Sequence, residues 1–328
     1  MCATCWKAAC GAWAIRFGSR PQLIQADDGS YLWADNYDTD IDELHQVQDA
    51  LLRNIALQLG VEPARAEFRL ARRKNPNNMD AWSLYQQARG TMMFMGWSEN
   101  SLRQATEQLR RAIEMEPDYS PPHAYLSLLL ALGRLFELVE DPESAHDESL
   151  KSAEQALKLD SSSSEVLGYV GCAFSDLNYK QRGIPIIEQA IELDPSNAQA
   201  HAALGAAKIV TGDLEAGIAD LSQAIKISPR DPGLAPWTTI LSIGCAYSGR
   251  PDELRHWAEM ACELDSRYFP GLIALAFSRV LDEQPKAAQN AIDNARELYP
   301  KLNQAYIERL MGSDVVRQFT EAGITIQA

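Results

Sequence analysis

Long apolar runs and an excess of positive charge are both absent from this sequence of 328 residues. The most apolar stretch, residues 125–139, contains Arg134 and is too short to cross a bilayer, which takes about 20 apolar residues. The amino end carries no apolar segment of the length that a signal peptide needs. We therefore expect no membrane insertion by this chain and a cytoplasmic location.

Basic residues are scarce relative to acidic ones. Lys and Arg number 30 against 45 Asp and Glu, so the formal charge is −15. A protein that tracks nucleic-acid phosphates carries a basic patch, so this balance argues against a nucleic-acid partner. The share of hydrophobic residues, 46%, is typical of folded proteins, and a chain of this length buries enough surface to fold without disulfides.

A short pattern recurs seven times along the chain: an alanine is followed five residues later by Pro or Ser. Successive instances are never closer than 34 residues, and three of the six intervals equal 34; the alanines are Ala71, Ala112, Ala156, Ala190, Ala224, Ala261 and Ala295. Small residues let antiparallel helices approach closely, and Pro or Ser ends one helix and begins the next. The repeat predicts an all-α solenoid of antiparallel helix pairs.

The clearest unit covers residues 198–229. Leu204-Gly205 falls in its first helix and Gly212-Asp213 in the turn, and small or apolar residues follow at helical spacing in the second helix: Gly217, Leu221 and Ala224. The preceding unit repeats the arrangement with Val170-Gly171, Gly183, Ile187 and Ala190.

This pattern resembles the tetratricopeptide repeat (TPR), in which Leu-Gly, a tyrosine-like position, two alanines and a proline recur. The resemblance covers residues 79–310, about six units, followed by a capping segment at 311–328. Insertions at 90–98 and 132–147, where we expect longer helices or loops, and an irregular start at 232–236 depart from it.

Residues 21–42 precede the repeats and have a different pattern. PQLIQ and YLWAD flank Asp28-Gly29, which predicts a β-hairpin. Asp40 or Asp42 then caps a helix that ends near Gly60, within linking helices over 43–78. The segment resembles the end of the TolB-like domain that precedes TPR arrays in class III adenylate/guanylate cyclase-type and CadC-type bacterial regulators. The resemblance implies a remnant hairpin in an N-terminally truncated chain, and full-length relatives that are also found in the periplasm.

Residues 1–20 do not fit that resemblance. They lack a hydrophobic period and are rich in Cys, Trp and Ala. One valid set of codons for them, read two bases later, gives VRYVLEGSVRRLGDTIRVTA, an alternating strand–turn–strand that leads into the hairpin. Two interpretations are open: an out-of-frame segment or a disordered native terminus. The nucleotide sequence distinguishes them.

Residue sets that carry chemistry are few. Cys2, Cys5 and Cys10 supply three thiols, whereas a structural zinc takes four ligands. The acidic residues of 38–43 lack the glycine and glutamate of a calcium loop. The five histidines form no catalytic or metal motif, and the later cysteines have the pattern of buried apolar residues. We predict no catalytic residue, no metal and no cofactor.

Stacked helix pairs leave a concave inner surface lined by the first helix of each pair. The repeat assigns six candidate contacts to it: Gln87, Tyr125, Tyr169, Cys172, Gln199 and Phe277. The sequence thus predicts a non-catalytic scaffold that binds a peptide or a protein in this groove. The alternative is a sensor module of a cyclase or transcription regulator whose effector domain is missing. The partner and the oligomeric state stay open.

Overall fold

The computed structural model describes residues 4–13, 16–25, 31–34, 37–40, 81–229, 231 and 233–326, with side chains from residue 81 onward. The chain divides into two compact units, Met1–Gly90 and Thr91–Ala328.

The first unit contains a small antiparallel sheet with β2 (Arg16–Gln25) at its centre. β2 pairs with β1 (Thr4–Trp13), β3 (Tyr31–Ala34) and β4 (Tyr37–Asp40). Leu23 lies opposite Trp33 in the β2–β3 ladder. The pairing of β1 with β2 does not tell which reading frame is the native one. The out-of-frame interpretation of residues 1–20 therefore stays a prediction. The expected helices of residues 43–78 lie outside the described residues.

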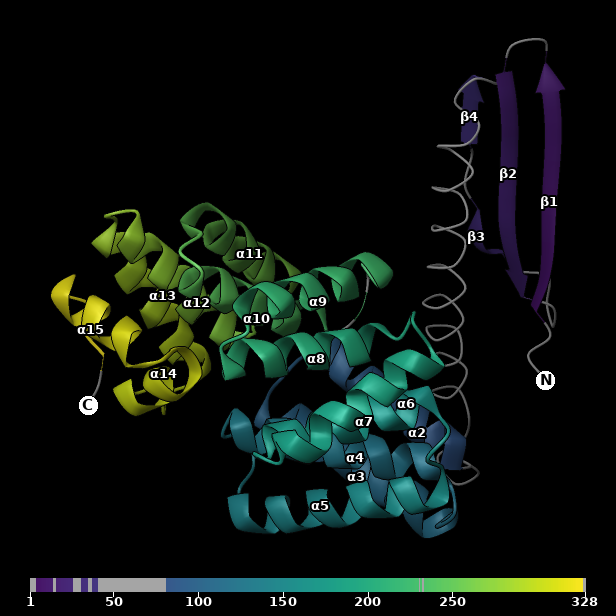
Figure 1. The fold of residues 1–328 in the computed structure, drawn as a ribbon, viewed down its shortest axis with the longest axis horizontal. Helices are drawn as coiled ribbons and strands as arrows, with labels where there is room; N and C mark the ends of the chain where they lie inside the picture. The colour runs from purple at the N-terminus through teal and green to yellow at the C-terminus, as the bar shows by residue number, and fades with distance from the viewer. Residues whose placement is uncertain are drawn as a thin grey trace. The chain divides into compact units, whose positions relative to one another are not determined.

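From α4 onward the described helices follow one another in antiparallel pairs (Figure 1). Their bounds are α2 Ala81–Met95, α3 Glu99–Met115, α4 Ser120–Leu135, α5 Pro142–Leu159, α6 Ser164–Asp176, α7 Lys180–Leu193, α8 Ala198–Thr211, α9 Leu214–Ile227, α10 Leu234–Tyr247, α11 Pro251–Leu264, α12 Phe269–Leu281, α13 Pro285–Leu298, α14 Gln304–Met311 and α15 Ser313–Glu321.

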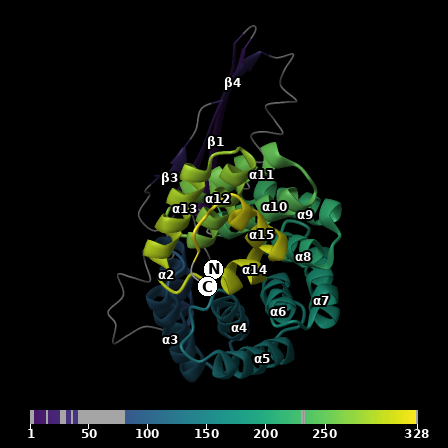
Figure 2. The ribbon, with the colours of Figure 1, turned by 90° about the vertical axis from the view of Figure 1, so that its left-hand side faces the viewer.

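Thr91–Ala328 has the predicted TPR-like helical solenoid fold. Within this unit, α4, α6, α8, α10 and α12 line the inner side of a curved path, and α5, α7, α9, α11 and α13 lie outside (Figure 2). The clearest predicted unit is confirmed: α8 and α9 flank Gly212, whose φ of 91° makes the turn. Residues 132–147, where a longer helix or loop was expected, hold the end of α4, a loop and the start of the 18-residue α5, whereas α10, which begins within 232–236, has 14 residues.

Glycines set the distance between the two helices of a pair. A Cβ added to Gly205 of α8 would lie 2.7 Å from the Gly217 carbonyl oxygen of α9. In the preceding pair, a Cβ on Gly183 would lie 2.6 Å from the Gly171 carbonyl oxygen. Both distances are shorter than van der Waals contact, so the two backbones touch directly and the small-residue pattern has a steric cause.

The largest apolar core runs from α8 to the carboxyl end of the chain. There α14 and α15 cover the last full pair, and Phe319 of α15 packs edge-to-face on Phe277 of α12 with ring centroids 6.1 Å apart. Phe319, Ile307 and Leu302 are completely buried. The terminal helices therefore seal the apolar end that the last repeat would otherwise leave open, as terminal repeats must.

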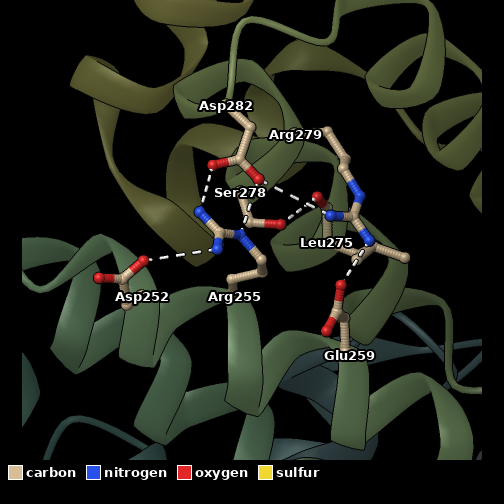
Figure 3. Close-up of polar contacts among 7 residues, drawn as sticks. All are labelled: Asp252, Arg255, Glu259, Leu275, Ser278, Arg279 and Asp282. Atoms are coloured by element: carbon tan, nitrogen blue, oxygen red, sulfur yellow. Dashed lines mark hydrogen bonds and ion pairs between the residues drawn. The ribbon is translucent and has the colours of Figure 1, made fainter.

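Ion pairs join α11 to α12 at the surface of the array (Figure 3). Arg255 donates from Nε and Nη2 to Asp282, at 2.7 and 2.5 Å, and Arg279 Nη2 donates to Glu259 at 2.5 Å. The Asp282 hydrogen bond and charge raise the pKa of Arg255. Bidentate geometry fixes the relative orientation of two guanidinium-bearing helices, so this network specifies how α11 and α12 align and adds little stability at the surface.

Candidate functional site

The six predicted groove residues all lie on first helices of their pairs. They are distributed over α2, α4, α6, α8 and α12, and the structure leaves four of them half-buried: Gln87, Tyr125, Tyr169 and Gln199. Gln87 belongs to the first compact unit, Met1–Gly90. The candidate surface described here is therefore the part of the inner side that α4, α6 and α8 form in the second unit.

The two predicted tyrosines are direct neighbours. The rings of Tyr125 in α4 and Tyr169 in α6 have centroids 5.2 Å apart and are tilted by 47°. Both rings pack on an apolar cluster that includes Leu128, Leu167 and Ala203. Adjacent repeats thus combine into one aromatic surface, with Gln199 on the next first helix.

Two other predicted contacts are buried, which corrects their assignment to an open surface. Cys172 is 8% exposed and Phe277 is 4% exposed. Phe277 is covered because α15 packs on α12, an arrangement that the repeat pattern does not encode. Cys172 belongs to the apolar bed beneath the tyrosines. A ligand that binds on α4, α6 and α8 therefore contacts the tyrosines and not these two side chains.

A polar residue that the sequence analysis did not single out lies beside this bed. Asp176, at the end of α6, accepts a hydrogen bond from the Cys172 thiol, with Sγ 3.4 Å from Oδ2. Desolvation raises the pKa of Asp176 to about 7, and the thiol bond and Lys180 oppose that rise. The i, i+4 spacing of Cys172 and Asp176 on the apolar helix α6 was the signal available in the sequence, and Lys180 begins the next helix, α7.

Replacing Asp176 by asparagine is expected to flatten the pH dependence of stability. Because the folded-state pKa is raised, the folded protein binds more protons than the unfolded chain between about pH 4 and 7, and stability falls as pH rises through that window. This one group lowers the free energy of unfolding by up to ~1.4 kcal/mol per pH unit. Urea denaturation of D176N and wild type across this window measures it. Parallel pH profiles would contradict the raised pKa, and D213N, at an exposed aspartate, is the control.

Two histidines of the array make equivalent contacts. His123 Nε2 lies 2.9 Å from the Pro117 carbonyl oxygen, and His201 Nε2 lies 3.1 Å from that of Pro195. The same contact thus recurs in two repeats and ties a first helix to the turn before it.

Among the described residues, no three His, Cys, Asp or Glu side chains come together as a metal-binding group. The same part of the chain contains no helix with the length and apolarity needed to cross a bilayer. The side chains of Cys2, Cys5 and Cys10, and the acidic residues of 38–43, lie outside the described side chains, so their assignments stay predictions.

Comparison with known proteins supports the repeat architecture. Residues 166–197, which cover α6 and α7, match the family model described as tetratricopeptide repeat. A crystal structure of the APC/C hetero-tetramer Cut9–Hcn1 aligns with a TM-score of 0.54 at 13% identity, over 74% of this chain and 43% of that chain. PilF of Pseudomonas aeruginosa aligns with a TM-score of 0.47 at 14% identity, over 74% of this chain and 96% of that chain. At 13% identity the likeness to Cut9–Hcn1 is one of fold.

A curated relative is a putative adenylate cyclase 3 of Rhizobium meliloti (strain 1021). It is 27% identical over 116 residues, or 35% of this chain. The match spans 19% of the relative's own length, so this chain corresponds to about a fifth of that protein.

Proposed function

We propose that the chain is a non-catalytic scaffold that binds an extended peptide or a partner protein on the inner side of the array. The observation that carries this proposal is the pair of adjoining rings, Tyr125 and Tyr169, on successive first helices over an apolar bed. Aromatic side chains that present both an apolar face and a hydroxyl are favoured anchors in protein interfaces. Gln199 would supply an amide to the backbone of the bound segment.

Replacing Tyr169 by alanine is expected to weaken peptide binding at least tenfold, because a desolvated aromatic anchor carries about 2 kcal/mol or more. The probe is a peptide selected from a random phage-displayed library on the full chain, with affinity measured by titration calorimetry. Tyr179→Ala is the matched control, since Tyr179 is exposed in the turn of the same repeat. Equal losses in both variants, or unaltered binding by a Tyr125→Ala/Tyr169→Ala double variant, would contradict the assignment.

The second candidate is a regulatory module of a signalling protein. The relative named as an adenylate cyclase supports it, because the match covers a minor part of that protein and leaves room for an effector elsewhere. The nucleotide sequence upstream of the coding region tests this proposal. An effector-coding segment there, in either frame, would favour the module, and it would also show whether residues 1–20 are out of frame.

A further inference from the structure

Residues far apart in the sequence meet at Glu137, between α4 and α5. Tyr299 Oη donates to Glu137 Oε2 at 2.8 Å, and Arg309 Nη2 donates to Glu137 Oε1 at 2.5 Å. Tyr299 follows α13 and Arg309 lies in α14, so both partners come from the carboxyl-terminal end of the array. One carboxylate therefore joins an early turn of the solenoid to its last helices.

Aromatic side chains surround this contact from both ends of the array. Phe136 packs edge-to-face on Trp97 and on Tyr268, with centroids 5.5 and 6.0 Å apart. Tyr299 stacks on Phe269 at 4.6 Å with an interplanar angle of 12°, and Tyr306 contacts both rings. The carboxyl-terminal segment thus brings two tyrosines to an aromatic surface that begins at Trp97 and Phe136.

The charges of the two sides are complementary. Lys301 Nζ lies 3.2 Å from Glu99 Oε1, which adds a second ion pair to that of Arg309 with Glu137. The early side contributes Glu99 and Glu137, and the later side contributes Lys301 and Arg309. In a chain with a net charge of −15, placing two cations opposite two carboxylates is a specific feature of this segment.

The backbone at Glu137 shows that this side chain occupies a disfavoured position. The turn between the helices of a pair uses a left-handed residue, and glycine fills that place at Gly212 and Gly249. Glu137 adopts a φ of 54° there. This conformation is disfavoured for residues other than glycine, asparagine and aspartate. A glutamate at this position gains the two hydrogen bonds to the last helices, which a glycine cannot make.

Two observations indicate that the contact is reversible. All four charged side chains remain 41–70% exposed, so water competes for them. The Tyr306 hydroxyl is buried with no hydrogen-bond partner among the described residues, a cost that release into solvent would remove. Water can therefore replace the polar contacts of the closed arrangement, whereas Leu302, Tyr306 and Ile307 hold the same segment by apolar burial.

We propose that residues 299–309 form a latch: they occupy an acidic, aromatic docking surface made by Trp97, Glu99, Phe136 and Glu137, and loss of their polar contacts with Glu99 and Glu137 loosens the segment and opens the inner side of the array to a partner. The closing contact stands on its own geometry, whereas the gating of partner access rests on the proposed scaffold function. Residues 299–309 therefore compete with any partner that binds the docking surface.

Hydrogen–deuterium exchange on the full chain tests the closing contact with a matched pair of variants. Glu137→Gly removes the carboxylate and leaves glycine in a left-handed turn that suits it, and Glu283→Gly makes the same change at φ 57°, where no side-chain partner occurs among the described residues. We expect Glu137→Gly to raise amide exchange about tenfold in residues 96–99 and 299–311 and to leave α7–α9 unchanged. Glu283→Gly is expected to alter its own turn alone.

Exchange that rises only around residue 137, or equally throughout all helices, would overturn the latch. Tyr299→Phe is the second variant, because it removes one hydroxyl and keeps the ring stacking; it is expected to raise exchange in the same two regions by a smaller factor. Identical exchange in Tyr299→Phe and wild type would also count against the latch.

Affinity for the selected peptide tests the gating. The open variant Glu137→Gly is expected to bind it about tenfold more tightly than Glu283→Gly does. Unchanged affinity alongside raised exchange would overturn the gating and leave the closing contact. Failure to select any peptide that depends on Tyr169 would instead contradict the scaffold function, while the exchange result would still decide the latch.

Discussion

Replacing Phe319 by alanine is expected to lower the free energy of unfolding by about 3–5 kcal/mol. Phe319 is completely buried in α15 and packs on Phe277, so its removal leaves a cavity in the largest core of the array and loosens the helices that cover it. Urea denaturation followed by circular dichroism measures the loss.

Leu298→Ala is the matched control for this truncation, because Leu298 is 44% exposed and its loss is expected to cost less than about 1 kcal/mol. In a repeat protein each pair depends on its neighbours, so Phe319→Ala should also make α12 and α13 the first segments cut by a protease. A loss equal to that of Leu298→Ala would show that α15 does not seal the core.

Replacing Gly205 by alanine is expected to destabilise the protein by about 1–3 kcal/mol, since overpacking at a helix contact has that cost. The sign of this stability change is informative because helix propensity alone predicts stabilisation: alanine is favoured over glycine in a helix by about 1 kcal/mol. The new Cβ would lie 2.7 Å from the Gly217 carbonyl oxygen and 2.9 Å from the Leu221 backbone nitrogen. Backbone atoms of α9 cannot rotate away, so α8 and α9 must separate.

Gly271→Ala is the control, because it measures the effect of higher helix propensity without a close backbone contact. Gly271 also lies in a helix, but the nearest atom to an added Cβ is the Ala261 side chain at 3.3 Å. This variant is expected to be neutral or slightly stabilising by thermal or urea denaturation. Stabilisation in both variants would show that close backbone contact does not determine the glycines of the repeat.

Much of the helical architecture was predictable because it is encoded locally. The recurring alanine and the following Pro or Ser located the second helices, and Gly212 located a turn that the structure places between α8 and α9. Periodicity suffices for these features because each pair contacts mainly its neighbours.

The candidate surface was predictable only in part. Tyr125 and Tyr169 were assigned to the same inner surface without any statement of contact, and the structure places their rings side by side. The same assignment failed for Phe277, because α15 covers this position and the cap does not follow the repeat pattern. Asp176 was missed because the repeat alone does not say which side chains at a helix end lose water.

The sequence by itself determined the all-α repeat, the positions of its turns and the small residues at its helix contacts, because these depend on interactions within a pair. Only the tertiary structure decided that Glu137 meets Tyr299 and Arg309, and that the terminal helices bury Phe277. The first contact depends on the curvature that accumulates over successive repeats, and the second depends on a cap that does not follow the repeat pattern. A small rotation per repeat leaves no mark on any single pair, yet its sum decides which distant side chains meet.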